Sequence, residues 1–142
     1  MIKNTICVLL IEDDPGDVEL TKESLSTNKI KINLKVLKDG VEALKYLHQS
    51  DKHNLPDLIF LDLNLPRKDG REVLKEIKSN DKLKAIPVVV LTTSEADEDI
   101  LKSYNLGANC YVTKPVGIEQ FSKVIQTIED FWFTIVKLPV KY

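Results

Sequence analysis

Five polar side chains that could do chemistry stand at the ends of four short apolar runs. Glu12 and Asp13 follow VLLI, Asp62 follows LIFL, Thr92 follows VVVL, and Lys114 follows CYVT. If these runs are parallel strands of one sheet, their carboxyl ends share one edge, which is where open α/β folds bind their ligands. The spacing therefore predicts a polar pocket at that edge.

The residue types favour metal-assisted phosphoryl transfer. Carboxylates crowded at a half-buried edge repel one another and take up protons unless a cation compensates them. An oxygen-only cluster suits Mg²⁺, and Lys114 supplies a second, fixed positive charge. Asp62 is the best-placed nucleophile, because a Leu-Pro pair turns the chain into a loop soon after it. Its attack on phosphorus would give an aspartyl phosphate, whose oxygens Mg²⁺, Lys114 and Thr92 would share.

Each of these residues also has an ordinary structural explanation when it is taken alone. Glu12 and Asp13 would be a loop acid and a helix cap, Thr92 a β-branched strand residue, and Lys114 a surface lysine. Their joint occurrence at four strand ends favours the pocket.

Other acids are explained as helix caps. Asp14 precedes a proline, and both Asp39 and Asp69 begin D-x-x-E sequences that resemble capping boxes. Ser94 begins a weaker version, S-x-x-D. We therefore expect these acids to start helices and not to bind a ligand.

The chain alternates apolar runs with longer amphipathic segments. The runs predict strands over Ile6–Ile11, Ile32–Leu37, Leu58–Leu61, Val88–Leu91 and Cys110–Val112, and the segments predict helices over about 16–27, 41–50, 71–80 and 97–105, with a last helix from about 118. Near-continuous apolar strands suit a parallel sheet covered on both faces. The alternation predicts an α/β fold with a doubly wound five-stranded parallel sheet.

Composition narrows the range of functions. The chain has 142 residues and a net charge of −2, with no basic stripe, so we expect one domain and no binding to nucleic acid. No apolar stretch approaches the ~20 residues that a membrane-spanning helix needs. Cys7 and Cys110 lie in expected strands and are interpreted as reduced core thiols. These features indicate a cytoplasmic protein without a membrane partner.

The segments VLLIEDDPGD, LIFLDLNLPRKDG, PVVVLTTS and GANCYVTKP together resemble the response-regulator receiver domain of two-component signalling. The resemblance implies the flavodoxin-like (βα)5 receiver fold, with a receiver domain over 5–130 and a C-terminal extension over 131–142. It implies that Asp62 accepts a phosphoryl group from a sensor histidine kinase, and that the protein promotes only its own phosphoryl transfer and dephosphorylation and is not an enzyme.

The resemblance also assigns roles within the site. Asp13 and Asp62 would bind Mg²⁺ directly, Glu12 would do so through water and Asn64 through its backbone carbonyl. Thr92 would be the switch hydroxyl, Lys114 the lysine that pairs with the phosphate, and Tyr111 the aromatic residue whose rotamer follows Thr92. As in the family, the Lys114–Pro115 bond is expected to be cis.

Thr93 departs from the commonest family pattern, in which a small residue stands at this position. A branched side chain there would crowd the attacking water, so we expect slow loss of phosphate from Asp62.

The C-terminal segment carries more apolar surface than one core-facing helix needs. Spacings of three, four or seven residues define a stripe of Ile118, Phe121, Ile125, Ile128 and Trp132 that should face the core. Off this stripe lie Phe131, Phe133, Ile135 and Val136, which predict a homodimer through the last helix and tail. DFWFTIVKLP resembles the ends of small receivers that work with bacterial phytochrome kinases, which implies a phytochrome-type partner. Few residues follow the receiver, so we expect it to act alone, through protein contacts.

Two other functions remain open from the sequence. An aspartyl-phosphate phosphohydrolase of the haloacid-dehalogenase type needs D-x-D, but here Asn64 stands where the second acid should deliver a proton. A nucleotide- or flavin-binding protein needs a glycine-rich loop after the first strand, where this chain has EDDPGD. The receiver interpretation accounts for more of the residues.

Overall fold

The central layer is a five-stranded parallel sheet in the order β2-β1-β3-β4-β5. The computed structural model describes residues 5–26 and 31–140. The strands are β1 (Thr5–Ile11), β2 (Lys31–Leu37), β3 (Leu58–Leu61), β4 (Val88–Thr92) and β5 (Cys110–Thr113). Neighbouring strands all pair in parallel, which confirms the doubly wound sheet.

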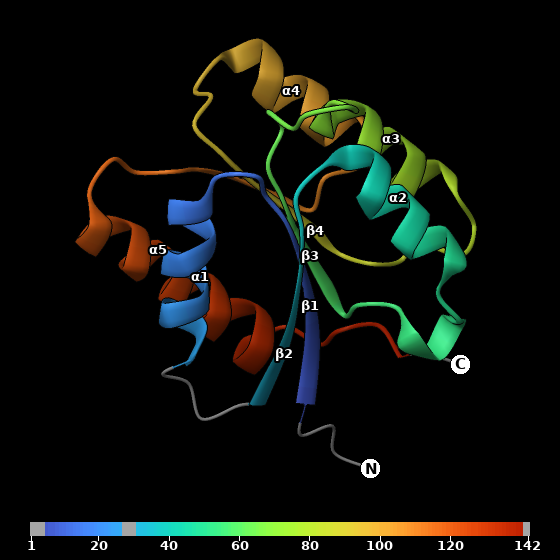
Figure 1. Ribbon diagram of the computed structural model, residues 1–142, viewed down its shortest axis with the longest axis horizontal. Coiled ribbons are helices and arrows are strands. Elements are labelled where there is room, and N and C mark those ends of the chain that lie inside the picture. The colour runs from blue at the N-terminus through green and yellow to red at the C-terminus, as the bar shows by residue number, and fades with distance from the viewer. Residues whose placement is uncertain (1–4, 27–30, 141–142) are drawn as a thin grey trace.

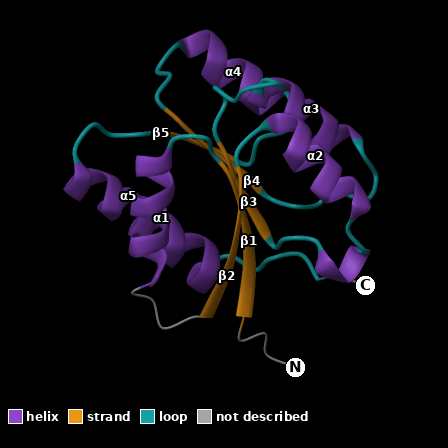
Figure 2. Ribbon diagram, in the orientation of Figure 1, coloured by secondary structure: helices purple, strands orange, loops and turns teal. Residues whose placement is uncertain are grey.

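Helices cover both faces of this sheet (Figures 1 and 2). One face carries α1 (Pro15–Ser26) and α5 (Ile118–Asp130), and the other carries α2 (Gly40–Gln49), α3 (Gly70–Ser79) and α4 (Asp97–Asn105). A short 3₁₀ helix, η1 (Lys52–Asn54), precedes β3, and a π-helical turn, η2 (Phe131–Ile135), extends α5. The expected helices agree with the observed ones to within about a residue, except that position 27 lies outside the described residues. None of the helices in the described part of the chain has the length and apolar character to cross a bilayer.

The strand sequences reflect their positions in the sheet. Every residue of β3 and β4 is buried, because helices cover both faces of these central strands. The edge strand β2 alternates instead, with Lys31, Asn33 and Lys35 exposed. The centre of the sheet is thus buried and apolar, and the polar residues after β1 and β3 lie directly at the end of these strands.

Asp14, Asp39 and Asp69 act as caps, as predicted. Each accepts a hydrogen bond from a backbone N–H two or three residues later, at 2.8, 2.7 and 3.0 Å. The prediction for Ser94 is wrong, because the residue before α4 is Ala96, which makes no side-chain capping bond. The Ser94 hydroxyl donates instead to the Asp99 carboxylate at 2.6 Å.

The last helix packs largely as its stripe predicts. Phe121, Ile125, Ile128 and Trp132 are buried against the sheet. Ile118 is 67% exposed, so its assignment to the core is wrong. The first turn of α5 lies away from the sheet (Figure 1).

The π-helical turn changes which aromatic residues face inward. Trp132 and Phe133 are both buried, whereas Phe131 and Ile135 are 49% and 68% exposed. A π-helical turn is wider than an α-helical one, so adjacent side chains share the inner face. The interpretation of Phe133 as surplus surface is therefore wrong, and so is that of Val136, which packs partly buried against the same core. The exposure expected for Phe131 and Ile135 is confirmed.

Candidate functional site

The carboxyl edge of the sheet holds an open acidic pocket of ≈ 420 Å³. Glu12 and Asp62, which directly follow β1 and β3, are buried in its floor, and Asp13 and Asn64 are exposed at its mouth. Lys114, which follows β5, is also buried there. Side chains separated by up to about 100 residues thus meet where parallel strands end.

Lys114 is the positive centre of this pocket. Its ammonium donates hydrogen bonds to Glu12, to Asp17 at 2.9 Å and to Asp62 at 3.1 Å. The Lys114–Pro115 peptide bond is trans, so the expected cis bond is wrong. The trans form is the one that X–Pro bonds favour by roughly 0.5–1 kcal/mol, and from it the lysine already reaches three carboxylates.

Asp62 is held from both sides. The Thr92 hydroxyl, at the end of the neighbouring strand, donates to Oδ1 at 2.9 Å, and the Asn64 N–H donates to the same oxygen at 3.1 Å. Lys114 binds the other oxygen, Oδ2. Behind the residue lies Gly70, where a side-chain carbon would come within 2.3 Å of the Asp62 carbonyl oxygen. Glycine at the start of α3 therefore lets the helix approach the loop that carries the carboxylate.

The two buried acids ionise differently. Burial raises the pKa of Glu12 to about 8, against the opposing effect of its hydrogen bond to Lys114. Burial would also raise the pKa of Asp62, but the hydrogen bond with Glu12 and the Lys114 charge outweigh it and hold that pKa below its usual value. Asp62 therefore stays ionised at neutral pH and keeps the negative charge that a nucleophile needs.

The acidic cluster has the donor chemistry of a hard divalent cation. One carboxylate oxygen from each of Glu12, Asp13 and Asp62 lies within 4.8 Å of the others. Among the described residues, neither histidine nor cysteine lines the pocket. Such oxygen sets bind Mg²⁺ or Mn²⁺. Five carboxylates line this pocket against one ammonium, that of Lys114, so a cation fits the cluster.

Tyr111 does not enter the pocket but holds the loop beside it. The Tyr111 hydroxyl donates to the backbone carbonyl of Ser94 at 3.0 Å. The Ser94 hydroxyl donates to Asp99, and Asp99 accepts from the Arg71 guanidinium at 2.8 and 3.0 Å. We call Arg71, Ser94, Asp99 and Tyr111 the loop clamp. It joins β5, α3 and α4 to the segment that directly follows Thr92.

The structure brings together Glu12, Asp13, Asp62, Asn64, Thr92 and Lys114, all expected at this site. Sequence reasoning missed Asp17, whose carboxylate binds Lys114 from the first turn of α1. A usable signal was present, because a helix that follows β1 begins at the carboxyl edge, and an acid in its first turn can face that edge. The clamp residues Arg71 and Asp99 carried no comparable signal.

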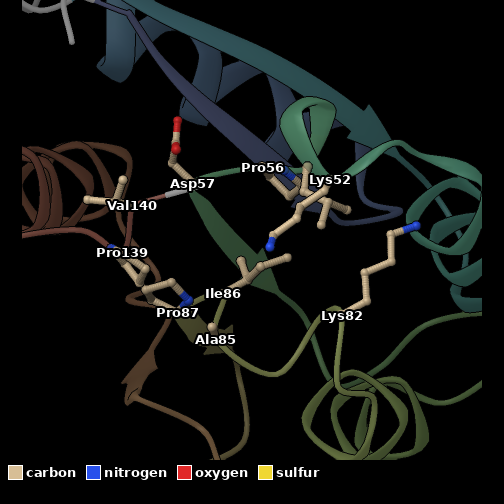
Figure 3. Close-up of a pocket in the computed structure, with 10 residues that line it drawn as sticks. Lys52, Pro56, Asp57, Lys82, Ala85, Ile86, Pro87, Pro139 and Val140 are labelled. Carbon is tan, nitrogen blue, oxygen red and sulfur yellow. The ribbon is translucent and has the colours of Figure 1, made fainter. Parts of the chain in front are cut away.

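A second, smaller hollow lies at the opposite, amino edge of the sheet. It measures ≈ 80 Å³ and is lined by residues before β3 and β4, such as Pro56 and Pro87, and by Pro139 and Val140 of the tail (Figure 3). Ligand pockets are usually several times larger, at about 300 Å³ or more. The tail crosses the sheet edge at this hollow, which is too small for a typical ligand site. The acidic pocket therefore remains the candidate functional site.

Comparison with known proteins identifies the class. The model of the response regulator receiver domain matches residues 8–126, and the chain belongs to this family. Response regulator Rcp1 of Synechocystis sp. (strain PCC 6803) is 49% identical over 135 residues, covering 93% of this chain and 92% of Rcp1.

Solved structures of response regulators have the same fold as this chain. The Mn²⁺-bound form of Rcp1 superposes with a TM-score of 0.90 at 48% identity, covering 95% of this chain and 99% of that one. The phosphorylated cyanobacterial phytochrome response regulator RcpA gives 0.91 at 45% identity, covering 96% and 99%. The chain is a receiver-type response regulator with the flavodoxin-like fold.

Proposed function

We propose that Asp62 of this response regulator accepts a phosphoryl group from the phosphohistidine of a sensor histidine kinase. The observation that carries the proposal is the pair of donors on Asp62, with Thr92 on one oxygen and Lys114 on the other. An Asp62 oxygen bonds to phosphorus as the phosphorus–nitrogen bond breaks, and the electron pair stays on the imidazole of the kinase. The ionised state of Asp62 supports its role as the attacking group.

The surrounding residues would stabilise the transferred group. The Thr92 hydroxyl and the Lys114 ammonium lie within hydrogen-bond reach of the carboxylate, and so of oxygens bound to phosphorus there. Glu12, Asp13, Asp62 and the backbone carbonyl of Asn64 would hold Mg²⁺. When bound, Mg²⁺ neutralises charge on the phosphoryl oxygens.

The signal would leave the site through Tyr111. Thr92 and Ser94 are two residues apart, so a shift of Thr92 toward a phosphoryl group moves the carbonyl that Tyr111 holds. The face formed by α4, β5 and α5 would then change, and a partner protein would read it. This is a shift between existing conformations, biased by phosphorylation.

The tail supports a homodimer. Phe131, Ile135 and Val140 are 49%, 68% and 70% exposed, within the last part of the chain that the structure describes. Several exposed apolar side chains within one short segment favour association with another protein surface. We expect a dimer mass by light scattering at micromolar concentration, and a monomer for Phe131→Ser with Ile135→Ser. The control is Leu101→Ser, which removes an exposed apolar residue from α4; a monomeric wild type, with and without phosphate, would exclude this dimer.

The kinase partner is proposed to be of phytochrome type, since Rcp1 and RcpA are similar over nearly their whole length. The protein would act in the cytoplasm through protein contacts, without nucleic acid or membrane. Its receiver domain would span 5–130, and residues 131–142 would form the extension. It would promote its own phosphorylation and dephosphorylation without turning over other substrates.

A phosphohydrolase is the weaker candidate. Asn64 is exposed at the pocket mouth, where such an enzyme needs an acid to protonate the leaving group. Turnover of p-nitrophenyl phosphate that Asp62→Asn abolishes would revive it.

The decisive experiment is incubation with acetyl phosphate and Mg²⁺, followed by intact-mass measurement. We expect the mass of one phosphoryl group on the wild type and none on Asp62→Asn or without a divalent cation. Labelling that persists in Asp62→Asn would contradict the assignment. Asp57→Asn is unsuitable as a control because Asp57 accepts a hydrogen bond from the Cys7 backbone; exposed Asp81→Asn is the matched variant.

A further inference from the structure

We infer that Asp17 is a positioning residue that holds the Lys114 ammonium in the pocket during phosphoryl transfer; this rests on the proposed role of Asp62. Lysine has three N–H donors, and here all three are used, on Glu12, Asp17 and Asp62. A phosphoryl oxygen is a fourth acceptor. Lys114 therefore has to release one partner before it binds the phosphoryl group.

The three partners differ in what happens to them. Asp62 loses charge when one of its oxygens is esterified, which weakens its attraction for the ammonium. Glu12 belongs to the carboxylate cluster that fits a divalent cation. Asp17 lies outside that cluster, and neither change alters its charge. Its bond to Lys114 is the one that persists while the other two are exchanged.

The position of Asp17 suits this role. It lies in the first turn of α1, where the helix dipole stabilises a carboxylate. Its side chain is 24% exposed, against 4% for that of Lys114, so it contacts the ammonium from the pocket mouth. A flexible lysine held at one oxygen keeps its remaining donors aimed at the reacting centre and loses less freedom when the phosphoryl group arrives. Asp17 thus acts through Lys114 and not on phosphorus.

The test is a double-mutant cycle between Asp17 and Lys114. The probe is beryllofluoride with Mg²⁺, and its dissociation constant is measured by calorimetry for the wild type, Asp17→Asn, Lys114→Gln and the double variant. Losing one partly exposed, charge-assisted hydrogen bond should weaken binding about tenfold in Asp17→Asn. Lys114→Gln should weaken it more, and adding Asp17→Asn to Lys114→Gln should change it by less than about twofold.

Two further measurements separate positioning from a general charge effect. Glu19→Gln makes the same charge change on the exposed side of α1 and should leave binding unchanged. Urea unfolding without divalent cation should give Asp17 and Lys114 a coupling of about fivefold in the unfolding constant. Equal effects of Asp17→Asn in both backgrounds, or no coupling in urea, would overturn the inference. If wild type and Asp62→Asn both fail to bind beryllofluoride, both the proposed function and the inference about Asp17 are wrong. If wild type binds it and only the Asp17 effects are absent, the inference is wrong and the proposed function stands.

Discussion

Replacing Glu129 by glutamine should stabilise the protein at alkaline pH and not at acidic pH. Glu129 lies in the last turn of α5, is only 3% exposed, and its Oε2 atom has no hydrogen-bond partner among the residues that the structure describes. Burial, with a smaller contribution from the Asp130 charge, raises its pKa from 4.5 to about 7. The folded state therefore binds this proton more tightly than the unfolded state does.

The direction of the pH effect follows from that difference. Below pH 4.5 the carboxyl group is neutral in both states and costs nothing by its charge. As the pH rises toward 7, the unfolded state ionises first, so the folded state loses stability, and the loss is complete above 7. The interval between the two pKa values corresponds to about 3 kcal/mol in the free energy of unfolding, at about 1.4 kcal/mol for each tenfold change.

Urea unfolding followed by the fluorescence of Trp132, the single tryptophan, measures this effect. The stability of Glu129→Gln minus that of the wild type should increase by about 3 kcal/mol between pH 4.5 and 8. An amide without partners costs the same at every pH, so it cancels in this comparison. Asp130→Asn is the control and should keep the wild-type pH dependence at a slightly lower midpoint. A difference between Glu129→Gln and wild type that is constant over this pH range would refute the reasoning.

Three further predictions concern the site and its support. In the loop clamp, Arg71→Gln and Asp99→Asn should each destabilise the fold, and their losses should not add in a urea double-mutant cycle, since the two side chains contact each other and are about one-fifth exposed. Additive losses would contradict the clamp. Thr93→Ala should shorten the lifetime of phosphate on Asp62, followed by intact mass over time, because Thr93 lines the pocket; an unchanged lifetime would remove Thr93 from the control of dephosphorylation. Gly70→Ala should lower the melting temperature, with a loss of about 2 kcal/mol or more, because a methyl group would overlap the Asp62 backbone; wild-type stability would show that α3 can move away.

The sequence predicted the sheet well because its signals were local. Leu58–Leu61 is an unbroken apolar run between a proline turn and a polar loop, and the observed β3 has the same bounds. The pocket followed from the strands, because parallel strands align their carboxyl ends. The five side chains at strand ends were therefore predicted to meet, and they do, with Asn64 beside them.

The remaining differences arise from tertiary geometry. The Asp17–Lys114 contact joins residues 97 apart and depends on how the first turn of α1 faces the sheet edge. The α-helical period used for the last segment places Phe133 on the surface, but a π-helical turn brings it inside. Ile118 has the spacing of the core-facing stripe, but its side chain is exposed because the first turn of α5 does not lie against the sheet. The spacing of apolar residues predicts which face of a helix points inward, but not how much of the helix lies against the sheet.

The tail carries a kinetic consequence. It leaves α5 on one face of the sheet, packs Val136 and Leu138 there, and crosses the amino edge to Pro56 and Pro87 (Figure 1). This crossing has a surface to dock on only after β3 and β4 have paired, so we expect the tail to be among the last segments to fold. Contacts that form after the transition state slow unfolding and leave the folding rate nearly unchanged. We therefore expect the tail contacts to lower the unfolding rate, and so to lengthen the time for which the native state persists once formed.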